Sequence, residues 1–235
     1  NVGAEDWETL RSYFASGGPE NTRRVLEYAT WMLQRGAKPN AATFFVPCAS
    51  FYSSTNGSGN ATIIFYRSVV EGGQTAPINA LIEQLEMRGL NVSAIYVSSL
   101  KDKICQTILR EHFSKHPADV IINATSFAVG NAEQDVLAQQ NCPVLQVTLA
   151  GSTEEQWLNS SAGLATKDLA MSVVLPELDG RIYAGVISFK ADQLWHDKTQ
   201  CRIVTYKPVA ERIGHVADLA TNWAALRTTP NVEKR

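Results

Sequence analysis

The sequence lacks most of the features that assign a function directly. Its 235 residues include only four cysteines, which lie tens of residues apart without a C-x-x-C pair, at Cys48, Cys105, Cys142 and Cys201. This spacing argues against a zinc ribbon and against a dense disulfide framework. No run of about 18 apolar residues occurs, so no membrane span is expected. These absences favour a cytoplasmic protein with free thiols.

An excess of one charge is also missing. The chain has 21 Lys and Arg residues against 23 Asp and Glu residues, for a net charge of -2. Their mixing along the sequence excludes a dominant basic face that would bind nucleic acid. The length suffices for one large domain, alone or with an attached lobe. Because no basic-then-apolar leader precedes Asn1, we expect a processed chain or a piece of a longer one.

Two common catalytic signatures are absent as well. The sequence contains no G-x-x-x-x-G-K-[ST] phosphate loop, and Gly57-x-Gly59 precedes a predicted strand and lacks the third glycine of a dinucleotide motif. It also contains no G-x-S-x-G nucleophile elbow. ATP or NAD binding by this chain and serine-hydrolase chemistry are therefore not expected.

What the sequence does contain is a regular alternation of apolar segments. It predicts strands at 61–66, 92–97, 120–123 and 143–149 and helices at 77–88 and 102–115. Such alternation indicates an α/β fold with a mostly parallel, doubly wound sheet and flanking helices. We expect this α/β domain to span 61–235 and an N-terminal helical and linker segment to span 1–60, with a helix to about residue 35, a strand at 43–46 and a loop at 50–60.

The last third departs from this alternation. Apolar runs at 171–175 and 182–188 flank a Pro/Gly-bounded turn and predict a strand pair, and a C-terminal helix follows at 208–227. The turn carries Glu177 and Asp179, which are close enough in sequence to hold a divalent cation or to accept a proton. Ordinary turn chemistry is the alternative explanation.

Other candidate binding residues follow the predicted strands. In parallel sheets, ligands bind outside the carboxyl ends of the strands. Four cations stand at predicted strand ends, namely Arg67, Lys101, Arg181 and Lys190. They suit a ligand with several carboxylates, although ordinary strand-end charge explains them equally well. Ser126 follows the third strand, and Trp157 follows the fourth, where it either packs on a flat ligand or belongs to the core.

The histidines give a weaker signal. His112 and His116 are four residues apart on a predicted helix, as metal ligands would be, and Cys105 lies one heptad earlier. Because Cys105 and His112 fall on the apolar stripe of that helix, packing is the favoured interpretation. His196 lies in a polar segment, where a loop histidine could pass a metal ion onward.

Specific segments carry a family resemblance. They include Phe65-Tyr66-Arg67, Val97-Ser98-Ser99-Leu100-Lys101 and Leu175-Pro176-Glu177-Leu178-Asp179-Gly180-Arg181. From about residue 60 to 235 the chain resembles the large subunits of the CobN/magnesium-chelatase family. The first of these segments, together with 98–102, favours the cobalt branch over the magnesium branch. The family's subunits are several times longer, so the resemblance implies a fragment.

The resemblance implies a metal-inserting enzyme. The expected reaction is insertion of Co²⁺ into hydrogenobyrinic acid a,c-diamide during aerobic cobalamin biosynthesis, driven by ATP hydrolysis with Mg²⁺ on AAA+ ATPase and adaptor partner subunits. Glu177 and Asp179 would supply a base or a transient metal ligand, with His196 as a further transient ligand and no tight metal site. The substrate-binding candidates are Arg67, Lys101, Ser126, Trp157 and Arg181.

Two alternatives stay open at this point. The chain could belong to the porphyrin-binding subunit of magnesium chelatase, or it could be a structural or interaction module without ligand contact. In each case the isolated chain is expected to be inactive.

Overall fold

The chain forms two compact units in a computed structural model that describes residues 3–39, 42–44, 46–130, 134–191, 194–198 and 200–234. The smaller unit comprises Asn1–Pro47 and Arg67–Gln74, and the larger one comprises Cys48–Tyr66 and Thr75–Arg235. The expected division after residue 60 differs from this one, because the segment from residue 49 pairs with the sheet of the larger unit.

The smaller unit is helical. It contains α1 (Ala4–Ser16), α2 (Gly18–Met32) and α3 (Arg67–Glu71). The first two helices are separated at Gly17, whose φ of 62° favours glycine. The buried rings of Tyr13 and Tyr28 meet edge to face with centroids 6.3 Å apart. An apolar contact between the two helices therefore organises this unit.

The strand predicted at 43–46 is wrong for its described residues. Residues 42–44 have no regular secondary structure, and residue 45 lies outside the described ranges. Asn21 donates from Nδ2 to the Phe44 carbonyl at 2.6 Å and accepts from the Phe44 N–H at 2.8 Å. Because one buried side chain satisfies both backbone groups, this segment needs no partner strand.

The larger unit is built on a seven-stranded sheet with the order β1-β3-β2-β4-β5-β6-β9. The strands are β1 (Ala49–Ser54), β2 (Asn60–Tyr66), β3 (Asn91–Val97), β4 (Val120–Asn123), β5 (Val144–Thr153), β6 (Ile182–Lys190) and β9 (Tyr206–Pro208). The central pairs from β3 to β6 are parallel, and the edge strands β1 and β9 are antiparallel to their neighbours. The predicted mostly parallel α/β fold is confirmed.

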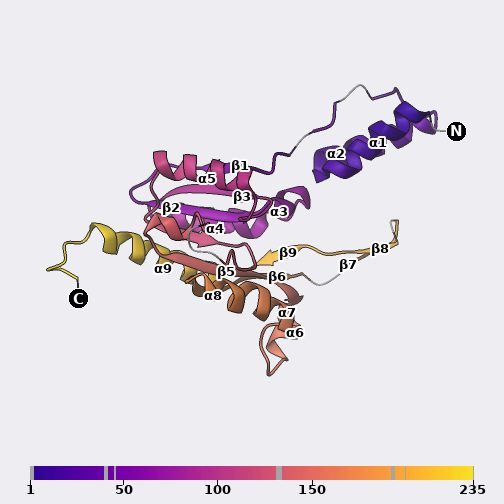
Figure 1. Ribbon diagram of the computed structural model, residues 1–235. Coiled ribbons are helices and arrows are strands. Elements are labelled where there is room, and N and C mark those ends of the chain that lie inside the picture. The colour runs from indigo at the N-terminus through magenta and orange to yellow at the C-terminus, as the bar shows by residue number, and fades with distance from the viewer. Residues whose placement is uncertain are drawn as a thin grey trace. The chain divides into compact units, whose positions relative to one another are not determined.

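Helices cover both faces of the sheet (Figure 1). Helix α5 (Lys103–Lys115) packs Leu109 against Ile64 and Ile95 on one face. The alternate residues Phe65 and Tyr96 point to the other face, which is covered by α4 (Ala76–Glu86) and α9 (Ala210–Thr228). The period-2 alternation of the central strands thus divides their apolar side chains between two helical layers.

Strand β1 replaces most of the loop predicted at 50–60. Its serine-rich sequence resembles a loop, but as an edge strand it exposes part of its surface and tolerates polar side chains. The irregular turn begins only after Ser54, where β1 ends. A Cβ on Gly57 would lie 2.4 Å from the Gly89 carbonyl oxygen, so this close backbone approach requires glycine.

The strand predicted at 171–175 is also wrong. The structure has a continuous helical segment there, consisting of α7 (Thr166–Leu169), the π-helical η2 (Ala170–Val174) and α8 (Leu175–Leu178). A short apolar run does not distinguish a buried strand from a buried helix, and the β-branched valines favoured the strand. The second strand of the predicted pair, 182–188, is present as β6, but it pairs with β5. A separate antiparallel strand pair is formed by β7 (Leu194–His196) and β8 (Cys201–Ile203).

The remaining elements are short, namely η1 (Ala138–Gln140) and α6 (Glu154–Leu158).

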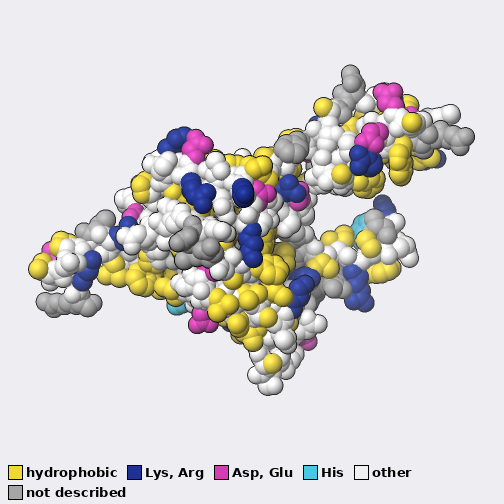
Figure 2. Space-filling view, in the orientation of Figure 1, with side chains coloured by type: hydrophobic (Ala, Val, Ile, Leu, Met, Phe, Trp, Pro, Cys, Tyr) yellow, Lys and Arg dark blue, Asp and Glu magenta, His cyan; other side chains and the backbone are white. Residues whose placement is uncertain are grey.

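The surface carries side chains of mixed character. On the face drawn in Figure 2, basic and acidic side chains both occur on the larger unit, with apolar side chains among them. Within the described ranges, no helix combines the length and the hydropathy that crossing a membrane requires.

Candidate ligand crevice at the carboxyl ends of the parallel strands

A crevice lies where the winding of the sheet reverses. From β2 the chain crosses to β3 on one side, and β4 then pairs with β2 on the other side. Such switch points form ligand sites in open α/β sheets. A crevice of about 130 Å³ occurs here, lined by Tyr66 at the end of β2, by 99–101 after β3 and by 126–129 after β4. The structure thus brings Lys101 and Ser126 together at one edge of the sheet.

The loop after β4 is anchored at its base by a buried amide network. Asn123 donates from Nδ2 to Gln146 Oε1 at 2.6 Å, and Gln146 donates from Nε2 to the Thr125 carbonyl at 2.7 Å. The Thr125 hydroxyl donates to Asn123 Oδ1 at 2.8 Å. Because all three side chains are buried, these bonds fix the direction in which the loop leaves the strand.

Tyr66 connects the end of β2 to the loop after β4, and both line the crevice. Its phenol donates to the Ser126 carbonyl at 2.9 Å and accepts from the Ser126 N–H at 3.0 Å. Burial raises the pKa of Tyr66, so the phenol stays protonated at neutral pH and keeps this donor. The Ser126 hydroxyl lies 3.0 Å from the Ser172 hydroxyl in η2, which ties the loop to the helical segment.

Asp179 and Arg181 support this loop from behind and do not line the crevice. The Asp179 carboxylate accepts from the Val129 N–H at 2.6 Å and from the Gly130 N–H at 3.0 Å. Arg181 Nη2 lies 3.2 Å from Asp179 and 3.6 Å from Asp135, and each of these side chains is at most 5% exposed. No guanidinium nitrogen of Arg181 makes a hydrogen bond within the described part of the chain. The two carboxylates therefore hold the cation mainly by charge.

The other predicted cations and Glu177 lie in different surroundings. Lys101 is exposed beside the crevice, and Glu177 is exposed on α8. Arg67 begins α3 in the smaller unit and pairs with Glu71 at 3.1 Å. Lys190 lines a second, larger hollow at the end of β6. Within the larger unit, the structure brings only Lys101 among these cations to the crevice.

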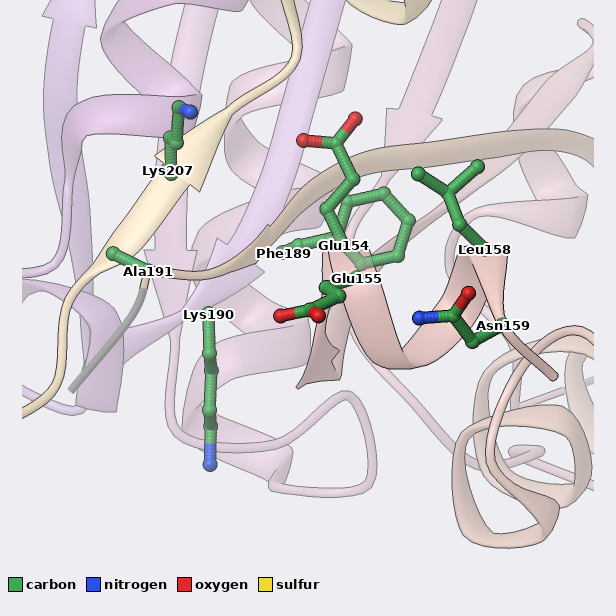
Figure 3. A pocket seen from close by; sticks show the side chains of 8 residues that line it. All are labelled: Glu154, Glu155, Leu158, Asn159, Phe189, Lys190, Ala191 and Lys207. Atoms are coloured by element: carbon green, nitrogen blue, oxygen red, sulfur yellow. The ribbon is translucent and has the colours of Figure 1, made fainter.

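The second hollow, of about 360 Å³, lies between α6 and the ends of β6 and β9. Figure 3 shows Glu154 and Glu155 on α6, with Lys190 and Lys207 on the strands across from them. Carboxylates and ammonium groups are thus both present, which suits an anionic ligand less well than the crevice, where Lys101 is the charged lining residue. The crevice is therefore the stronger candidate site.

Trp157 has a packing role at the base of α6. Its ring lies 5.5 Å from that of Phe189, and the Arg212 guanidinium carbon lies 4.5 Å from its ring centroid. It joins a small apolar cluster with Ala150 and Val186. The structure favours the core interpretation of this residue, with one face of the ring occupied by a cation.

The candidate metal ligands of the sequence do not come together. Among the side chains that the structure describes, three that could share an ion gather at one place, and these are Cys48, Asp102 and Cys105. Glu177, Asp179 and His196 do not belong to that group, and His196 pairs with Cys201 between β7 and β8. The sequence gives no signal that Cys48 joins this group, because the segment that follows it has the composition of a loop although it forms β1.

His112 is packed as the sequence favoured, but without hydrogen bonds. Its ring stacks on that of His116 at 5.4 Å and meets the ring of Phe51 edge to face at 5.2 Å. Neither ring nitrogen makes a hydrogen bond to any residue that the structure describes. Burial, with a smaller effect of His116, lowers the pKa of His112 to about 4.

Known proteins resemble the chain along its whole length. Residues 11–235 match the family model described as CobN/Magnesium Chelatase. The aerobic cobaltochelatase subunit CobN of Sinorhizobium sp is 36% identical over all of this chain, which spans 20% of that subunit. The chloroplastic magnesium-chelatase subunit ChlH of Oryza sativa subsp. indica is 26% identical over 74% of the chain and 13% of its own length.

A solved structure shares the fold. The catalytic subunit of cobaltochelatase from Mycobacterium tuberculosis superposes with a TM-score of 0.82 at 24% sequence identity. The superposition covers all of this chain and 20% of that subunit.

Proposed function

Because the chain belongs to the CobN/magnesium chelatase family, we propose that it forms part of the tetrapyrrole-binding large subunit of a cobaltochelatase. One observation carries the choice of branch. The chain is 36% identical to a cobaltochelatase subunit over its full length, but 26% identical to a magnesium-chelatase subunit over 74% of it. The proposed reaction is insertion of Co²⁺ into hydrogenobyrinic acid a,c-diamide, with ATP and Mg²⁺ used by AAA+ ATPase and adaptor partner subunits.

The crevice is proposed to bind one substituent of the corrin ring. Sites that enclose a whole drug-sized ligand usually have volumes of about 300–1,000 Å³. The crevice has about 130 Å³, room for one carboxylate- or amide-bearing arm of the macrocycle. Lys101 and the serine hydroxyls would bind the polar end of that arm, and Leu100 and Phe127 would pack against its carbons.

The two carboxylates of the 176–181 segment have different proposed roles. Metal insertion requires the ring to lose its inner N–H protons, and an exposed carboxylate such as Glu177 can accept a proton. Asp179 already accepts two backbone N–H bonds from the loop after β4. We therefore assign Asp179 a positioning role and Glu177 the role of proton acceptor.

A binding titration tests the crevice. The 235-residue chain is titrated with hydrogenobyrinic acid a,c-diamide and, separately, with protoporphyrin IX, and tryptophan fluorescence quenching is measured. We expect tighter binding of the corrin and about a tenfold loss in Lys101→Ala. Tenfold corresponds to about 1.4 kcal/mol, near the lower end for a hydrogen bond to a charged group.

Lys103→Ala is the matched control, because Lys103 is also exposed and near the start of α5 but does not line the crevice. Equal losses in the two variants would refute the crevice as the binding site. Tighter binding of the porphyrin would favour the magnesium branch. A folded chain that binds neither ring would leave only a structural or interaction role.

A second experiment separates the carboxylates in the full chelatase complex. We expect Glu177→Gln to lower Co²⁺ insertion while the affinity for the corrin stays unchanged, because the proton acceptor is lost. Asp179→Asn should weaken corrin binding as well, because the crevice loop loses its anchor. Wild-type turnover in Glu177→Gln would refute the role of Glu177, and Glu86→Gln on α4 is the control.

A further inference from the structure

A cluster of two thiols and one carboxylate lies near the start of α5, and none of its three residues lines the crevice. Cys48 immediately precedes β1, Asp102 is the N-cap of α5, and Cys105 lies in the first turn of that helix. One ligand atom from each residue, namely the two Sγ atoms and a carboxylate oxygen, lies within 4.8 Å of the other two. Cys105 is buried, and the other two residues are half-buried.

Backbone hydrogen bonds hold the three residues in place. The Ser98 N–H donates to the Cys48 carbonyl at 2.6 Å and joins the segment before β1 to the loop after β3. Asp102 Oδ1 accepts from the N–H groups of Ile104 and Cys105 at 2.8 and 3.3 Å. Cap geometry therefore orients the carboxylate, and its other oxygen, Oδ2, lies 3.5 Å from the Ser98 hydroxyl.

The spacing fits tetrahedral coordination. Zinc-like ions bind sulfur at about 2.3 Å and carboxylate oxygen at about 2.0–2.2 Å, which separates neighbouring ligand atoms by about 3.5–4 Å. The three atoms of the cluster lie within 4.8 Å of one another, so small side-chain rotations bring them to an ion. The Ser98 hydroxyl lies 3.3 Å from Cys105 Sγ and adds an oxygen atom close to the cluster.

The donor atoms select the class of ion. Thiolates prefer soft or borderline cations such as Zn²⁺ and Co²⁺, whereas Mg²⁺ and Ca²⁺ prefer sites made of oxygen atoms. The N-terminus of α5, where Asp102 and Cys105 lie, adds a positive dipole that favours negatively charged ligands at these two positions. We propose that Cys48, Asp102 and Cys105 bind a thiophilic divalent cation of the Co²⁺ and Zn²⁺ class, with one coordination position left to water or Ser98.

The proposal concerns the ion alone and holds whether or not the chain acts in a cobaltochelatase. Three protein ligands and one exchangeable position are typical of sites whose ion reacts or is released, whereas structural zinc sites usually have four protein ligands. The half-buried Cys48 and Asp102 form the side from which an ion can enter, and Cys105 closes the other side.

Titration with Co²⁺ alone tests the site, because thiolate coordination gives a charge-transfer absorption in the near ultraviolet that oxygen ligands do not give. The reduced 235-residue chain, kept in a non-chelating reductant, should bind one equivalent of Co²⁺ with this absorption. Zn²⁺ should abolish the absorption and Mg²⁺ should not. Cys48→Ser should lose most of it, and Asp102→Asn should retain it but bind at least tenfold more weakly.

Cys201→Ser is the control, because it removes an exposed cysteine of β8 that lies outside the cluster. Cys105 is fully buried, so the decisive variant is Cys48→Ser, with circular dichroism to show that it folds. Absence of the charge-transfer absorption in the reduced wild-type chain would overturn the proposal. An equal loss in Cys201→Ser and in folded Cys48→Ser would overturn it as well.

Discussion

The two halves of the sheet differ in regularity. In the half made of β3, β2 and β4, the parallel strands pair without a shift in register. In the half made of β5 and β6, the register shifts at three places. Gly185 of β6 adopts a φ of 127°, and the buried Ser188 hydroxyl makes no hydrogen bond within the described ranges. In the first half, regular pairing of apolar strands is sufficient to form the sheet. In the second half, the register shifts and the buried polar group show that pairing of apolar strands alone does not determine the structure.

The crevice depends on both halves. By sequence, its loop at 126–129 follows β4 and belongs to the regular half. By hydrogen bonding, the same loop is attached to the helical segment that connects β5 to β6 in the irregular half. The Phe127 N–H donates to the Met171 carbonyl at 2.8 Å, and the Val129 and Gly130 N–H groups donate to Asp179. The regular half thus places the crevice at the edge of the sheet, and the irregular half sets the position of its wall.

The largest effect is expected from removing the buried cation Arg181, which directly precedes β6 of the irregular half. Arg181→Met leaves the carboxylates of Asp135 and Asp179 without their cation in a site where each side chain is at most 5% exposed. Removing one partner of a buried ion pair costs about 3–5 kcal/mol. We expect a decrease of this size in the free energy of unfolding, measured with urea, together with weaker binding of the corrin that we propose as the ligand.

Arg110→Met is the control in the regular half, because Arg110 is exposed on α5. Its effect should stay within about 0.5 kcal/mol, as for most surface substitutions. If the two arginine variants had the same stability, the buried charges would not support the irregular half, and the comparison would fail.

The next effect concerns acid stability of the regular half. His112 on α5 has its pKa lowered from 6.5 to about 4, mainly by burial. A histidine with a depressed folded-state pKa stabilises the fold fully above the unfolded-state pKa, and this contribution is lost as pH falls from about 6.5 to about 4. At about 1.4 kcal/mol per pH unit, the loss amounts to about 3 kcal/mol.

Urea unfolding at pH 7.5 and at pH 4.5 measures this loss. His112→Leu should show a smaller decrease in stability between the two pH values than the wild-type chain. His215→Gln, at an exposed position of α9, should keep the wild-type decrease. Identical pH dependence in His112→Leu and the wild type would show that burial does not hold His112 neutral.

The sequence predicts the strands of both halves, β5 and β6 included, but it predicts the segment between β5 and β6 wrongly, because only the strands have local signals. Strands β2, β3 and β4 are short apolar runs, and Asp102 caps α5 with its own side chain. The irregular half depends on contacts between distant residues. The β-branched residues of η2 favour a strand, but η2 is helical and makes hydrogen bonds to the crevice loop, which is distant in sequence.

The location of two candidate residues follows from a similar local rule. The carboxyl ends of parallel strands share one edge of the sheet, which predicts that Lys101 and Ser126 lie at that edge, and in the structure both line the crevice. Their role in binding stays a prediction. The structure, however, places Asp179 and Arg181 behind the crevice wall, where burial and charge pairing decide their role. The contact of Cys105 with Cys48 spans 57 residues and depends on β1, so no local pattern could reveal it.

The smallest expected effect sharpens the comparison at the level of the backbone. Gly185 in β6 has a φ of 127°, and a Cβ there would meet no atom within 4 Å, so any cost of Gly185→Ala is conformational. Such strain costs about 1–3 kcal/mol in non-glycine residues. Gly214→Ala in α9 should stabilise the chain by about 0.5–1 kcal/mol, because alanine is favoured over glycine inside helices. Urea unfolding of the two variants should therefore give changes of opposite sign in the free energy of unfolding. If Gly185→Ala were stabilising, β6 would relax to regular pairing, and the fold would not require its irregularity.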